Sequence, residues 1–81
     1  NNFEMQWEST NNLINIKSDI AEQGTFQLID TKGTIIYTWK ASIDKGQNQT
    51  TLPSEKQLPK GIYLLNYKSE TQSKTISIFN P

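Results

Sequence analysis

The most informative stretch of this sequence runs from residue 26 to residue 37 and reads Phe26-Gln27-Leu28-Ile29-Asp30-Thr31-Lys32-Gly33-Thr34-Ile35-Ile36-Tyr37. Its first part alternates apolar and polar side chains, which is typical of a β-strand with one buried face. The segment from Asp30 to Gly33 has the residues of a type I turn, with Gly33 in the left-handed position of a bulge. The stretch therefore predicts two consecutive antiparallel strands joined by a short loop.

The second strand of this hairpin is expected to cover residues 34–40. Strict alternation places Ile35, Tyr37 and Trp39 on one face of that strand. Ile36 falls on the opposite face, with the polar residues. Ile35 is therefore expected to point the same way as the two aromatic rings.

Other segments carry strand signals as well, separated by turn residues at the short spacing of a sandwich. Together with the hairpin strands at 25–30 and 34–40, the seven expected strands include residues 3–8, 13–17, 49–52, 62–67 and 74–79. The run Ile62-Tyr63-Leu64-Leu65-Asn66-Tyr67 is the most apolar in the chain. It is predicted to be the central strand.

Three segments are expected to interrupt the strands. Residues 19–24 break the alternation, either as an irregular turn in which Gly24 takes a left-handed backbone or as one helical turn. The polar residues 41–49 are predicted to form a mobile loop, and residues 54–56 are predicted to lie in another loop.

A second sharp corner is predicted at Leu58-Pro59-Lys60-Gly61, where Pro59 sets φ and Gly61 is free to adopt a positive φ. Seven strands in ~80–100 residues, joined by hairpin signals, indicate an all-β, seven-stranded antiparallel immunoglobulin-like β-sandwich. Nothing divides the chain, so residues 1–81 are expected to form a single domain.

The composition excludes several kinds of chemistry. The chain has no His, no Cys and no Arg, and its formal net charge is zero. Without His or Cys there is no Ser-His-Asp triad, no thiolate nucleophile and no ordinary zinc or iron-sulfur site. Without Arg or a net positive charge, nucleic acid is not an expected partner. We therefore expect no enzyme activity, no cofactor and no metal.

Acidic side chains are the remaining candidates for a metal or catalytic site. They are Asp19, Glu22, Asp30 and Asp44. None has the spacing of a calcium loop, and so small a domain offers little cleft in which to raise the pKa of a carboxylate. Asp30 has a structural task already, because it can accept backbone N–H bonds in its turn. No catalytic residue is assigned.

Aromatic side chains allow two interpretations. Tyr63 and Tyr67, with Trp7, Tyr37 and Trp39, could form an exposed platform that stacks on sugar rings. They could instead fill a core that is short of aliphatic residues. Tyr63 and Tyr67 share one strand face with Leu65, which favours the core.

The order of these signals resembles a known family. The hairpin of residues 26–37, about 20 polar residues, the block Leu58-Pro59-Lys60-Gly61-Ile62-Tyr63-Leu64-Leu65 and a final strand containing Lys74 are together similar to the C-terminal sorting domains of the type IX secretion system of Bacteroidetes. The residues that carry the resemblance, and are taken as recognition candidates, are Asp30, Gly33, Leu58, Pro59, Gly61, Tyr63 and Lys74.

The resemblance implies a non-catalytic signal domain behind a passenger protein. Components of the type IX translocon or attachment complex would recognise it, and would direct or anchor the passenger at the outer membrane or cell surface after transit through the periplasm. The chain ends Ile78-Phe79-Asn80-Pro81, where family members end in a basic segment, so a variant that is not cleaved, from a secretion or attachment component, remains open.

Two further hypotheses concern binding. One is an immunoglobulin-like module, retained rather than cleaved, that holds carbohydrate or lipopolysaccharide through its aromatic residues. The other concerns the final strand, residues 74–79. As an unprotected sheet edge it could add a strand from the translocon, or it could be an ordinary edge protected by Lys68 and Lys74.

Overall fold

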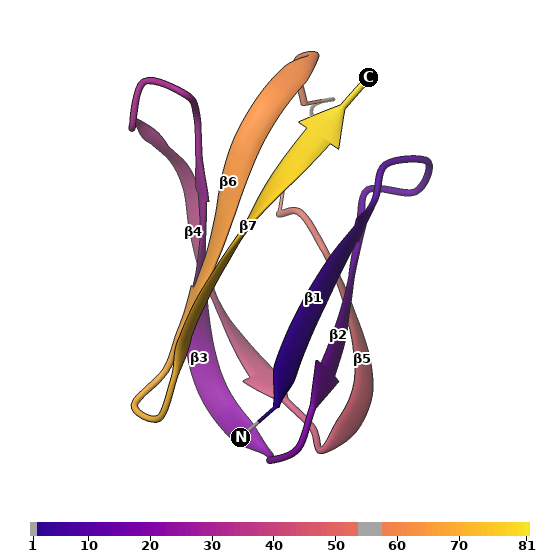
Figure 1. Cartoon of the computed structure of the whole chain (residues 1–81), viewed down its shortest axis with the longest axis vertical. Helices are drawn as coiled ribbons and strands as arrows, with labels where there is room; N and C mark the ends of the chain where they lie inside the picture. Colours follow the sequence, from indigo (N-terminus) through magenta and orange to yellow (C-terminus); the bar gives the residue numbers. More distant parts are fainter. Residues whose placement is uncertain (1, 54–57) are drawn as a thin grey trace.

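The computed structural model describes residues 2–53 and 58–81 as seven antiparallel strands (Figure 1). They are β1 (Phe3–Glu8), β2 (Leu13–Ser18), β3 (Glu22–Ile29), β4 (Ile35–Ile43), β5 (Gly46–Thr51), β6 (Gly61–Lys68) and β7 (Ser73–Asn80). This confirms the predicted all-β, seven-stranded immunoglobulin-like sandwich. The loop expected at residues 54–56 lies outside the described residues.

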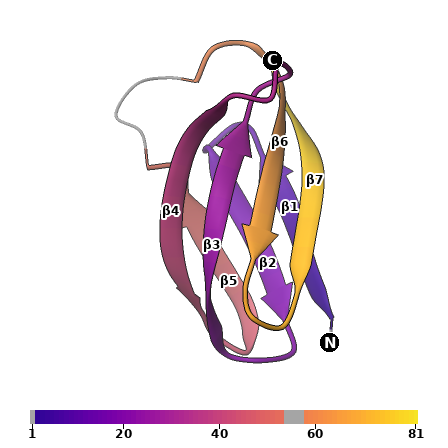
Figure 2. The ribbon, with the colours of Figure 1, turned by 90° about the vertical axis from the view of Figure 1, so that its left-hand side faces the viewer.

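The strands form two sheets that face each other (Figure 2). One sheet has the order β1-β2-β5 and the other the order β4-β3-β6-β7. The chain crosses between them after β2, after β4 and after β5. Strand β6 lies between β3 and β7, so the most apolar run is an internal strand, as predicted.

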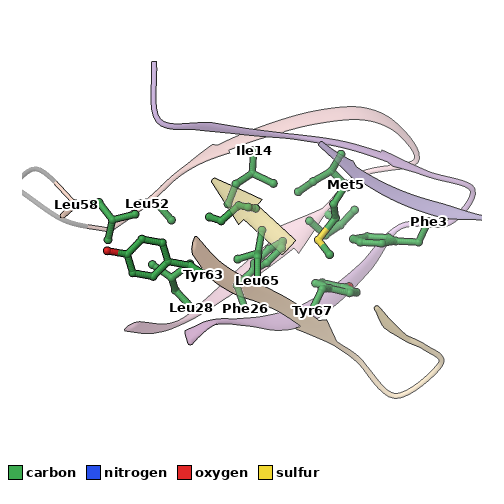
Figure 3. Packing of buried hydrophobic residues seen from close by; sticks show 13 residues of the cluster. Phe3, Met5, Ile14, Phe26, Leu28, Leu52, Leu58, Tyr63, Leu65 and Tyr67 are labelled. Carbon is green, nitrogen blue, oxygen red and sulfur yellow. The ribbon is translucent and has the colours of Figure 1, made fainter. Parts of the chain in front are cut away.

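The core lies between the two sheets and is built from alternate positions of their strands (Figure 3). In β6 the inward positions are buried and the positions between them are more exposed, which is the period of two expected for a half-buried strand. The fully enclosed side chains are Ile14, Phe26, Leu28, Leu65 and Tyr67.

The β3–β4 hairpin contains a bulge that corrects the predicted facing of β4. Leu28 pairs with Tyr37, but the next residue, Ile29, pairs with Ile35, so Ile36 is an extra residue in the ladder. Ile36 packs against the core, whereas Ile35 is 51% exposed. The prediction that Ile35 shares a face with Tyr37 was therefore wrong, because one inserted residue reverses the alternation beyond it.

The predicted interruptions are shorter than expected. Strand β4 continues to Ile43 and β5 begins at Gly46, so most of residues 41–49 is paired rather than looped. Gly24 does not have a left-handed backbone, and it lies inside β3. Its lack of a side chain serves packing, because a Cβ at this position would overlap the ring of Tyr67. Local alternation could not reveal this, because Tyr67 is distant in sequence.

Across the residues that the structure describes, no helix is long and apolar enough to cross a membrane.

Candidate functional site

Most of the predicted recognition residues gather at one end of the sandwich. Ile29 pairs with Leu64, and Gly61 pairs with Asn80, so the turn after β3, the start of β6 and the end of β7 lie at the same end of the sandwich (Figure 1). We call this the motif end: the turn Asp30–Gly33, the segment Leu58–Tyr63 and Asn80. It contains six of the seven predicted residues.

The first turn of the motif end has the predicted geometry. The Gly33 N–H donates to the Asp30 carbonyl at 3.1 Å, and Gly33 has φ of 86°, in the left-handed region. The Asp30 carboxylate accepts the N–H groups of Lys32 and Thr34, each at 2.9 Å. The Asp30 Oδ1 atom is therefore engaged in the turn, which fixes the shape of this corner.

The second turn is held by side chains from the adjoining strands. The Asn80 amide donates to the carbonyl of Leu58 at 2.7 Å and to that of Pro59 at 3.4 Å. The Tyr63 hydroxyl donates to the same Pro59 carbonyl at 2.6 Å. Leu58 is itself buried. The geometry of the turn thus depends on a nearby hydroxyl, that of Tyr63, and on the amide of Asn80, which is distant in sequence.

A shallow hollow of about 240 Å³ lies at this corner, between the second turn and the end of the chain. Its lining is Leu58, Pro59, Lys60, Asn80 and Pro81. Gly61, which has φ of 143°, turns the chain from this hollow into β6. The motif end therefore presents a hollowed surface lined by both polar and apolar groups.

Lys74 does not belong to the motif end. It pairs with Tyr67 near the turn between β6 and β7, at the opposite end of the strand from Asn80. Its side chain is exposed. The structure therefore separates Lys74 from the other candidates by nearly the length of β7.

The aromatic residues mostly serve the core. Tyr63 is 6% exposed and Tyr67 is fully buried. The Phe3 and Tyr67 rings stack with centroids 4.2 Å apart, and Phe26 stacks on Trp39 at 5.2 Å. These contacts confirm the core interpretation for the tyrosines of β6. The sugar-stacking alternative finds no support, because its two central rings are covered.

The acidic candidates do not converge. Among the described residues, no group of three acidic side chains is placed to hold a metal ion. The Asp19 carboxylate accepts the Asn2 N–H at 2.9 Å, and the Asp30 carboxylate closes its own turn. These carboxylates act as local hydrogen-bond acceptors.

Glu22 has the strongest hydrogen-bond network of the acidic residues. Its carboxylate accepts from the hydroxyl of Tyr67 at 2.6 Å, the hydroxyl of Thr71 at 2.7 Å and the amide of Gln72 at 2.7 Å. Burial raises the pKa of Glu22, but these donors stabilise the charged carboxylate by more, so the pKa falls to about 2. The pKa of Tyr67 is raised by burial and by its bond to this carboxylate. The network joins the start of β3 to the β6–β7 turn.

Two residues with clear contacts were missed in the sequence. Asn80 looks like a chain end, and Trp7 looks like one of several strand aromatics. The Trp7 indole N–H donates to the Phe79 carbonyl at 3.1 Å and so links β1 to β7 across the sandwich. Their spacing in the chain gives no signal, because both partners are remote: 22 residues for Leu58 and 72 for Phe79.

The fold and the motif end define a small immunoglobulin-like sandwich whose motif residues build turns and a strand end. No curated protein matches the chain significantly. The sequence profile of the family described as "Secretion system C-terminal sorting domain" matches residues 10–79, and the chain belongs to this family of type IX secretion domains of Bacteroidetes.

Family membership establishes the role of the domain. It is a C-terminal sorting signal that the type IX secretion machinery recognises, and it directs an attached protein toward the outer membrane or cell surface. Such domains are non-catalytic in general, and the protein that they direct lies N-terminal to them.

Proposed function

We propose that residues 1–81 act as one folded, non-catalytic sorting domain. The secretion machinery recognises it at the motif end, after transit through the periplasm. The observation that carries the proposal is the pair of bonds from Asn80 to the carbonyls of Leu58 and Pro59. Through them the family turn takes its shape only when the last strand is in place. Recognition of this end would therefore report that the domain has folded.

The six clustered candidates have different tasks in this proposal. Asp30 and Gly33 fix one corner, and Pro59 and Gly61 fix the other. Leu58 and Tyr63 anchor the second corner to the core. Lys74 lies at the opposite end, so we assign it no contact with the component that recognises the motif end.

Glycans and lipopolysaccharide have no place in this proposal. The partners are a component of the type IX translocon or attachment complex and the N-terminal passenger. Removal of the domain after export and its retention are both compatible with the proposal, because reading of the motif end precedes either fate.

The test attaches these 81 residues behind a periplasm-directed reporter in a type IX-competent bacterium and in a translocon-deficient strain. Asn80→Ala removes the donor and leaves a buried carbonyl of Leu58 unsatisfied. Asn66→Ala is the matched control, since the Asn66 side chain accepts a bond from the exposed Thr75 hydroxyl on the polar half of the sheet. A point substitution is preferable to deletion of β7, because deletion would also remove Ile78 from the core.

We expect translocon-dependent surface appearance of the wild-type fusion and of Asn66→Ala. Asn80→Ala should accumulate in the periplasm under conditions where circular dichroism still finds the purified domain folded. Export of a folded Asn80→Ala fusion at the wild-type rate would contradict reading at the motif end. Failure of the wild-type fusion to leave the periplasm would contradict the sorting role of the domain itself.

A further inference from the structure

The exposed apolar side chains of this domain are concentrated on one surface. Ile35, Ile62, Leu64 and Phe79 are between 42% and 59% exposed. All four lie on the outer face of the four-stranded sheet, in its half next to the motif end. We call these residues, together with the half-buried Ile29, the outer apolar patch.

The strand register makes the outer apolar patch continuous. Ile35 of β4 pairs with Ile29 of β3, and Ile29 also pairs with Leu64 of β6. Ile62 lies two residues from Leu64 on the same face and pairs with Phe79 of β7. Side chains directly opposite each other in an antiparallel pair have Cβ atoms about 5 Å apart. The patch therefore crosses the whole width of the sheet.

The remainder of the same face is polar. In the row next along the strands, Gln27 pairs with Asn66 and Asn66 with Thr75. The middle of the opposite outer face, on the three-stranded sheet, is also polar: Gln6, Asn15 and Gln49 are neighbours across its three strands. Apolar exposure is thus a local property of the patch and not a general property of the surface.

The core does not require these apolar side chains, because they point away from it. Threonine is also favoured in strands, and at the exposed positions of β6 and β7 it would leave less apolar surface in contact with water. Contiguous apolar surface with a polar surround is typical of a protein interaction site. The outer apolar patch is therefore best explained by a partner that covers it.

The charges around the outer apolar patch indicate what kind of partner fits. The patch itself contains no charged residue. Lys32 and Lys60, both exposed, lie in the two turns of the adjoining motif end. The one acidic residue in these turns, Asp30, has its Oδ1 atom committed to backbone bonds. A complementary partner surface would be apolar with carboxylates at its margin.

We propose that the outer apolar patch docks on an apolar surface bordered by acidic side chains, on a component of the type IX secretion machinery. This inference rests on the proposed sorting function and specifies the surface and the partner chemistry behind it. The docked partner would cover the patch and reach the motif end, since Ile62 directly follows Gly61 in β6.

The test uses the reporter fusion in two arms. The apolar arm combines Ile62→Thr, Leu64→Thr and Phe79→Thr, and its control combines Thr38→Ser, Lys68→Gln and Thr75→Ser on the polar half of the same sheet. The charge arm combines Lys32→Glu with Lys60→Glu. Its control, Lys17→Glu with Lys45→Glu, makes the same change in net charge on residues of β2 and the β4–β5 turn.

We expect the apolar-arm and charge-arm variants each to slow translocon-dependent export by about tenfold or more, as for the loss of a central interface contact. The two controls should export at the wild-type rate. Each purified domain is checked for an unchanged cooperative unfolding transition. Removal of exposed apolar side chains should leave this transition nearly in place.

Several results would overturn the inference. Normal export of the folded apolar-arm variant would do so while leaving the sorting function intact. Normal export of the charge-arm variant would overturn the acidic margin. Sedimentation showing a wild-type dimer that the apolar arm converts to monomer would assign the patch to a second copy instead. Absence of export for the wild-type fusion would refute the sorting function, and the inference with it.

Discussion

Gly24 of β3 lies directly beneath the ring of Tyr67 of β6, so close that no side chain fits between them. Tyr67 is fully buried and also stacks on Phe3 of the opposite sheet. The glycine thus makes room for a ring that joins the two sheets at this end of the core. The Tyr67 hydroxyl donates to the carboxylate of Glu22 at 2.6 Å, and Glu22 lies two residues before Gly24 in β3.

Gly24→Ala is expected to destabilise the domain by about 1–3 kcal/mol, because the new Cβ would force the Tyr67 ring to move in a packed core. Gly33→Ala is the matched control. Nothing lies near a Cβ at Gly33, so its cost comes from the positive φ alone, about 1 kcal/mol. Denaturant unfolding of both variants measures the difference. Combining Gly24→Ala with Tyr67→Leu should recover part of the loss, and no recovery would contradict the steric explanation.

The Glu22 network predicts a pH dependence of stability. The pKa of Glu22 is lowered in the folded domain, from its usual 4.5 to about 2. The network therefore contributes fully above about pH 4.5, and its contribution is lost as the pH falls toward 2. Glu22→Gln should be less stable than wild type at pH 7, by about 1–2 kcal/mol for bonds to a charged acceptor. The difference should shrink by pH 2.5. A constant difference between these pH values, measured by thermal unfolding, would refute the assignment.

The bulge in the β3–β4 hairpin gives a test that separates structure from simple alternation. Ile36→Ala should cost about 2 kcal/mol or more, because Ile36 packs against the core. Ile35→Ala should change the free energy of unfolding by about 0.5 kcal/mol or less, because Ile35 is 51% exposed. Strict alternation from Tyr37 and Trp39 predicts the reverse order. Urea unfolding of the two variants distinguishes these outcomes.

Trp7 is hydrogen-bonded to the C-terminal part of β7. Trp7→Phe keeps an aromatic ring but removes the indole N–H that binds the Phe79 carbonyl at 3.1 Å. We expect a loss of about 1 kcal/mol in stability. We also expect faster amide exchange in β7 near Phe79, because β7 is held to the other sheet partly by this bond. Unchanged amide exchange in β7 would show that the bond does not hold the edge.

The hairpin, the seven strands and the antiparallel sandwich followed from local signals. Alternation of period two, Asp30 and Gly33 in one turn and Pro59 and Gly61 in the other are properties of short segments, and physical chemistry acts on them locally. The structure confirms the strands and the positive φ of Gly33 and Gly61, and strict alternation fails only at the bulge in β4. The buried state of Tyr63 and Tyr67 was also predictable, because both share a face with Leu65 on an internal strand.

Contacts between remote segments could not be predicted in the same way. The bonds of Asn80 to Leu58, of Trp7 to Phe79 and of Glu22 to Tyr67 span between 22 and 72 residues. No local preference encodes such a pairing, since it depends on which strands become neighbours. The bulge at Ile36 likewise depends on the register that β3 and β4 adopt.

The sequence alone determined that this chain is an all-β domain without the residues of common active sites, and its motif order indicated the sorting family. Tertiary structure alone decided that the motif turns share one end with Asn80, that Lys74 lies far from them and that the exposed apolar residues form one surface. The physical reason lies in the hydrogen-bonded pairing of the strands. Hydrogen bonding between strands sets which distant residues meet, whereas alternation and turn chemistry act within a few residues of the chain.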